Sequence, residues 1–128
     1  MTSYYTIFDI TIEDTTDVEY EFLEDKVYAA ADDCDAEIKR AGKDTNICAR
    51  ENGDPDVAAE VLQEFLKKFR AADYLYFTWV TYTSRLSPGD LGGGAYFITA
   101  EKIECMTIHE WLRNKVRAQK EKEKQIGS

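Results

Sequence analysis

A chain of 128 residues with 44% hydrophobic and 12% aromatic side chains can bury one hydrophobic core. No apolar run approaches the roughly 18 residues of a membrane-spanning helix, and no basic segment followed by an apolar one opens the chain. We therefore expect neither a membrane segment nor a signal peptide. The expected organisation is one domain over residues 1–118 and a polar, basic, frayed tail over 119–128.

The charge is unevenly distributed along the chain. Residues 1–37 hold 12 acidic residues and one basic residue, whereas residues 113–128 hold six basic and two acidic residues, within a net charge of −9. Binding to a nucleic-acid backbone needs a basic surface, so the acidic excess argues against it. A basic protein is the partner that this charge favours.

The three cysteines, Cys34, Cys48 and Cys105, are odd in number and widely spaced. This pattern fits neither a paired disulfide framework nor a zinc motif. Because disulfides are rare in reducing compartments, we expect free, inert thiols and a cytoplasmic location.

The first elements read as two strands. Residues 4–12 and 18–23 alternate apolar and polar side chains, and the turn-like residues 13–17 between them predict a β-hairpin. The register that matches the apolar faces puts Asp9 opposite Glu21, and like charges that face each other are unfavourable. Such a pair suits either a solvated surface or the approach of a basic partner.

Two helices are expected next. Apolar residues recur at helical spacing from residue 25 to residue 41, and Gly42 stands where a C-terminal cap belongs. Residues 43–53 have no period and predict a loop. Asp54 and Pro55 are a favoured N-cap and first residue, and the second helix extends from them to about residue 72.

Residues 74–83 are almost all aromatic or β-branched, which indicates a strand. Large side chains on both of its faces predict a central strand that is covered, at least in part, on both sides. The glycine-rich residues 85–94 predict a flexible loop, because they match no phosphate-loop pattern and a strand follows them. The return strand is expected at 95–100 and a short fifth strand at 103–106.

The last helix begins with a capping box formed by Thr107 and Glu110. A short apolar stripe follows at helical spacing and consists of Ile108, Trp111, Leu112 and Val116. We therefore predict an α+β fold with the order ββααββ(β)α, in which three helices pack on a mostly antiparallel sheet of four or five strands. The hairpin over residues 4–23 is expected to supply outer strands.

Signals for catalysis are weak. His109 is the single histidine. The sequence selects none of the three cysteines as its partner, because a catalytic Cys–His pair depends on the distance between the two side chains in the folded protein and not on their spacing in the sequence. With 25 acidic residues, paired carboxylates are expected by chance. No metal motif and no cofactor motif is present, so we expect no cofactor.

The leading hypothesis is a non-enzymatic acidic protein that docks on a basic protein surface, by analogy with immunity proteins and nucleic-acid mimics. The acidic residues expected to contact the partner are Asp9, Asp17, Glu19, Glu21, Asp32 and Asp35. One alternative is a small enzyme or ligand-binding domain with a site near the loops 43–53 and 86–94. Another is a homo-oligomeric assembly component that uses an exposed aromatic surface or the basic tail.

Overall fold

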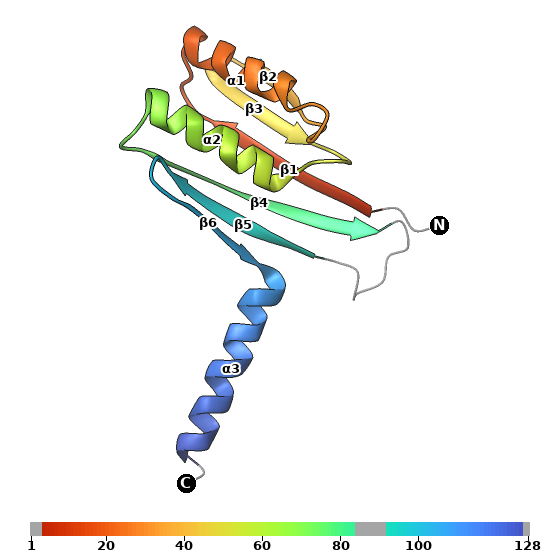
Figure 1. Ribbon diagram of the computed structural model, residues 1–128, viewed down its shortest axis with the longest axis vertical. Helices are drawn as coiled ribbons and strands as arrows, with labels where there is room; N and C mark the ends of the chain where they lie inside the picture. Colours follow the sequence, from red (N-terminus) through yellow and green to blue (C-terminus); the bar gives the residue numbers. More distant parts are fainter. Residues whose placement is uncertain (1–3, 84–91, 127–128) are drawn as a thin grey trace.

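The computed structural model describes residues 4–83 and 92–126 of the chain, and within them six strands form one antiparallel sheet. The strands are β1 (Tyr4–Ile12), β2 (Glu37–Ala41), β3 (Asp44–Ala49), β4 (Tyr74–Thr83), β5 (Gly92–Thr99) and β6 (Ile103–Thr107), and the helices are α1 (Asp17–Ala29), α2 (Pro55–Phe69) and α3 (Ile108–Ile126). The strand order is β2-β3-β1-β4-β5-β6. Helices α1 and α2 cover one face of the sheet, whereas α3 leaves the sheet beyond β6 (Figure 1).

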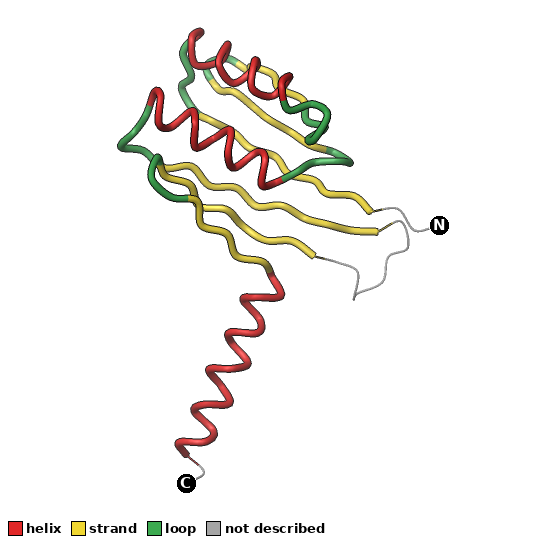
Figure 2. The backbone as a smooth tube through the Cα atoms, in the orientation of Figure 1, coloured by secondary structure: helices red, strands yellow, loops and turns green. Residues whose placement is uncertain are grey.

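The first six elements follow the order β1-α1-β2-β3-α2-β4, with β3 lying between β1 and β2 in the sheet. This is the split βαβ arrangement of ferredoxin-like domains. Strands β5 and β6 then widen the sheet on the β4 side, and α3 ends the chain (Figure 2). Because this arrangement supports many unrelated functions, it identifies none by itself.

The core lies between the sheet and the two helices. Alternation along β1 sends Phe8, Ile10 and Ile12 toward the helices, and α2 meets them with Leu62 and Phe65. Full burial of an aliphatic or aromatic side chain contributes about 1.5–3 kcal/mol relative to exposure. This layer therefore provides most of the stability of the domain.

The α+β class, the antiparallel sheet and the number of helices are confirmed, but the sheet has six strands in the described residues and not four or five. The predicted hairpin over residues 4–23 is wrong, because residues 18–23 belong to α1. Strand β1 is an inner strand, paired with β3 and β4. Asp9 faces Cys48 in the sheet and not Glu21.

The predicted helix over residues 25–41 is also wrong in its second half. Helix α1 ends at Ala29, and residues 37–41 form the edge strand β2. Gly42 has φ +66° and stands first in the two-residue turn to β3, a position that favours glycine. The expected loop 43–53 contains β3.

Strand β4 lies inside the sheet as predicted, but only one of its faces is covered in the described residues. Phe77 is 4% exposed and Tyr76 is 70% exposed, although they are neighbours on the strand. Residues 85–91 of the glycine-rich segment lie outside the described residues, and Gly92 begins β5. A Cβ atom on Gly94 would lie 2.4 Å from the carbonyl oxygen of Met106, so the close approach of β6 requires a glycine there.

Candidate functional site

Helix α1 begins with a capping box, and one side of the helix is buried. The Thr16 hydroxyl accepts a hydrogen bond from the Glu19 amide at 3.2 Å, and the Glu19 carboxylate accepts one from the Thr16 amide at 2.8 Å. This capping box starts the helix, and Glu19, Leu23 and Val27 then occupy its buried side at a spacing of four residues. The opposite side of the helix consequently faces solvent.

That opposite side carries Val18, Glu21, Asp25 and Tyr28, which we call the α1 outer stripe. Val18 is 63% exposed and Tyr28 is 66% exposed. Glu21 and Asp25 are exposed and take part in no ion pair among the described residues. The stripe therefore combines free negative charge with two apolar side chains.

Two of the predicted contact residues are instead bound within the chain. Asp17 pairs with Arg40, and Glu19 is 6% exposed and pairs with Arg70 at 2.9 Å. Burial acts to raise the pKa of Glu19, but hydrogen bonds from Arg70 and Thr16 and the charge of Arg70 outweigh it, so that the pKa lies below its ordinary value. The Glu19–Arg70 pair holds the start of α1 against the end of α2.

The other predicted residues are divided between two faces of the molecule. Asp32 and Asp35 are exposed in the segment that follows α1, and neither makes an ion pair within the described residues. Lys26, the one basic residue of this region, pairs with Glu64 at 2.9 Å. Asp9 lies on the far face of the sheet, where its carboxylate accepts a hydrogen bond from Asn46.

A second exposed surface was not among the predicted site residues. The sheet face away from α1 and α2, which we call the open face, carries Tyr74, Tyr76, Val80, Phe97 and Met106, and each is 42–70% exposed. Tyr74 stacks on Tyr76 and on Phe97. The alternation of residues 74–83 gives this surface in the sequence, but only the structure shows that no helix of the described residues covers it.

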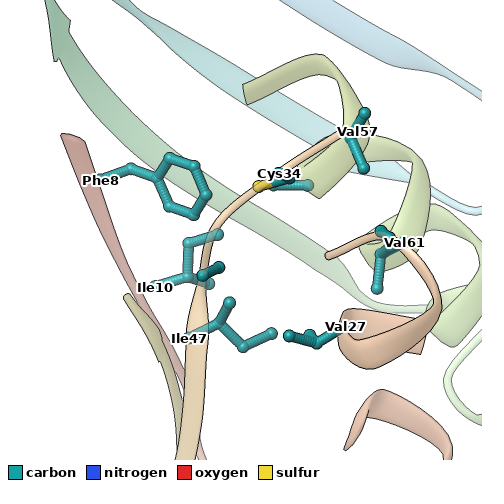
Figure 3. Close-up of a pocket in the computed structure, with 10 residues that line it drawn as sticks. Phe8, Ile10, Val27, Cys34, Ile47, Val57 and Val61 are labelled. Atoms are coloured by element: carbon teal, nitrogen blue, oxygen red, sulfur yellow. The ribbon is translucent and has the colours of Figure 1, made fainter. Parts of the chain in front are cut away.

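The cavity beneath α1 and α2 is unsuitable for a ligand. Its volume is about 20 Å³, and the side chains around it are apolar (Figure 3). Cys34 lies at its edge, where its sulfur accepts a hydrogen bond from the Asp54 amide at 3.2 Å. A void that holds about one water molecule and offers no polar partners stays dry.

The thiols of Cys34 and Cys105 are poorly suited to nucleophilic chemistry. Burial raises the pKa of the Cys34 thiol, and burial together with the charges of Asp56 and Glu110 raises the pKa of Cys105. Because the thiolate is the reactive form, a raised pKa lowers reactivity at neutral pH. In the described part of the chain, no group of three histidine, cysteine or acidic residues is placed to hold a metal ion.

The ligand site predicted near residues 43–53 and 86–94 stays a prediction, and a hollow of about 220 Å³ is lined by Cys48, Arg50 and Glu51 from the first of these segments. Residues 44–49 form β3, and residues 86–91 lie outside the described residues.

None of the helices of the described residues combines the length and hydrophobicity that crossing a membrane requires. Comparisons with protein-family models, curated proteins and solved structures found no match for this chain.

Proposed function

We propose that the protein acts by binding a basic protein through its acidic end, which consists of the α1 outer stripe and the segment with Asp32 and Asp35. The observation that carries this proposal is the composition of the stripe, in which Glu21 and Asp25 are free of ion pairs and lie between exposed Val18 and Tyr28. Tyrosine is enriched at the centre of protein interfaces and acidic side chains are not, so Tyr28 is the expected anchor.

The charges would direct the encounter. The acidic end belongs to residues 1–37, which hold 12 acidic residues and one basic residue, and that lysine is already paired with Glu64. A surface of one sign speeds association with a partner of the opposite sign and repels partners of the same sign. Nucleic acid is disfavoured here for the same reason. A cytoplasmic location stays part of this proposal.

The proposal is tested by capture from a lysate of the host cell. The wild-type chain, a Glu21→Lys/Asp25→Lys variant and a Tyr28→Ala variant are immobilised, and bound proteins are identified by mass spectrometry. Because charge reversal removes the attraction and the alanine removes the anchor, we expect each variant to lose a basic protein that the wild type retains. Raising the salt concentration is expected to weaken its capture by the wild type.

The matched control is Glu101→Lys/Glu121→Lys, which makes the same change in net charge at two exposed residues, one in the turn between β5 and β6 and one on α3. If this control loses the partner as fully as the α1 variant does, net charge and not the stripe governs capture. If all four proteins retain the same set of proteins, the acidic end is not a docking surface.

A further inference from the structure

The open face and α3 together hold most of the exposed apolar side chains of the molecule. Of the 12 large hydrophobic residues that are exposed in the described residues, nine lie on these two elements: Tyr74, Tyr76, Val80, Phe97, Met106, Ile108, Trp111, Leu112 and Val116. Contiguous apolar surface of this kind marks an interaction site. It lies on the opposite side of the sheet from α1 and α2.

The sheet and the helix contribute to one continuous surface. A hollow of about 380 Å³ is lined by Val80, Ala95 and Met106 from the open face and by Ile108 and Trp111 from α3. Helix α3 does not lie over its own sheet, because it begins at the residue after β6 and runs away beyond that edge (Figure 1). The apolar stripe of α3 is therefore uncovered at 47–53% exposure.

The order of side chains across the open face matches the order along α3. From the β6 edge, the open face first presents the apolar residues of β6, β5 and β4, with Glu104 on β6 paired to Lys102, and then Asp9 on β1 and both Glu37 and Lys39 on β2. Helix α3 presents its apolar stripe over residues 108–116, and residues 113–128, which overlap the end of the stripe, hold six basic and two acidic residues. An α3 that entered over the β6 edge would place its apolar stripe on the apolar strands and its later lysines near Asp9 and Glu37.

The spacing of the charges also agrees. Asp9 and Glu37 both pair with Cys48, so they point to the same face from strands that are two intervals apart, or about 10 Å. Lys115 and Lys122 are seven residues apart on the stripe side of α3, which is also about 10 Å. The 19 residues of α3 span about 28 Å, enough to cross the five strand intervals of the sheet, about 24 Å.

We propose that the occupant of the open face is a second copy of this chain. In the resulting two-fold dimer, each α3 crosses the open face of the other copy from its β6 edge. Trp111 and Leu112 pack on the apolar strands, while Lys115 lies near the partner subunit's Asp9 and Lys122 near the partner subunit's Glu37. Each copy contributes the same surface to the interface, as a closed two-fold dimer requires.

The mass of the full-length protein in solution tests the dimer, measured by light scattering or sedimentation over a range of concentrations. The wild type is expected to be a dimer, and Trp111→Glu/Leu112→Glu is expected to raise the dissociation constant at least tenfold. Both side chains are about half exposed in the single chain, so circular dichroism should show an unchanged fold. Asn114→Glu, which adds charge off the stripe, is the control and should still dimerise.

Charge exchange tests the direction in which α3 crosses the sheet. Glu37→Lys and Lys122→Glu should each weaken the dimer about fivefold, and the two substitutions in one chain should restore it. A wild type that is monomeric at every concentration would overturn the proposal and leave the surface to a different protein or to the chain's own α3. A dimer that survives the Trp111→Glu/Leu112→Glu change would equally overturn it, and failure of the double exchange to restore binding would overturn the crossing geometry.

Discussion

The two faces of the sheet are built from the same strands but differ in what covers them. On β4, Phe77 packs between the rings of Phe8 and Tyr96 beneath the helices, with ring centroids 5.6 and 5.2 Å apart. Its neighbour Tyr76 is 70% exposed on the open face. Successive side chains of one strand therefore have different roles. Those on the covered face stabilise the domain, and those on the open face are available for binding.

This separation places the two proposed surfaces on opposite sides of the molecule. The α1 outer stripe lies on the helix layer, and the proposed dimer uses the open face. If both proposals hold, a dimer would present two acidic ends outward and could engage two sites on a basic partner. Linked binding of this kind raises apparent affinity without any new contact, provided that the geometry allows both sites to be occupied.

The largest predicted effect is a loss of stability caused by a substitution on the covered face of the sheet. Phe77→Ala removes a buried ring from between two others, and the lost contacts and the cavity left behind should lower the free energy of unfolding by about 3–5 kcal/mol. Denaturant unfolding followed by circular dichroism measures the change. A loss below about 1 kcal/mol would show that the layer between the sheet and the helices is not the main source of stability.

A smaller loss of stability is expected when the Glu19–Arg70 ion pair between α1 and α2 is disrupted. Glu19→Gln removes the charge from a pair whose side chains are 8% and 21% exposed, and should cost about 1.5–3 kcal/mol at neutral pH. Because the pKa of Glu19 is lowered by folding, its contribution is complete above the ordinary pKa and is lost as the pH falls through the folded value. The difference in unfolding free energy between wild type and variant should therefore shrink on acidification.

The matched control for this pH dependence is Glu21→Gln on the exposed side of the same helix. Glu21 makes no ion pair in the described residues, so its variant breaks no pair and should change the free energy of unfolding by less than about 0.5 kcal/mol at neutral pH. Unfolding curves at several pH values compare the two. Equal pH profiles for both variants would mean that the Glu19–Arg70 pair does not fasten α1 to α2.

Elements with concordant local signals could be predicted from the sequence. Residues 74–83 favour a strand at nearly every position, and Asp54 caps α2 as expected, accepting hydrogen bonds from the amides of Asp56 and Val57. The α3 helix also begins where predicted, and the Thr107 hydroxyl accepts a hydrogen bond from the Glu110 amide at 3.1 Å, which is one of the two bonds of the expected capping box. In these segments the side-chain period, the cap and the tertiary environment favour one structure.

The sequence predicts a strand in place of the first two turns of α1 because two periods coincide there. Val18 to Leu23 alternate as in a strand, yet Glu19, Leu23 and Val27 also fall on one side of a helix. The capping box of Thr16 and Glu19 was the signal that distinguishes the two. Without the helix, Val18 and Tyr28 could not be placed beside Glu21, and Glu19 could not be recognised as buried. The edge strand β2 has only five residues and depends on pairing with β3.

The smallest predicted effect concerns the open face. Tyr76→Ala removes an exposed ring that stacks on Tyr74, and in dilute solution it should lower the free energy of unfolding by less than about 1 kcal/mol. At high protein concentration the wild type should gain stability through dimer formation, and the variant should gain less. Unfolding midpoints measured across a range of concentrations compare the two. A large loss in dilute solution would mean that Tyr76 stabilises the single chain, and the contrast with Phe77 on the same strand would then fail.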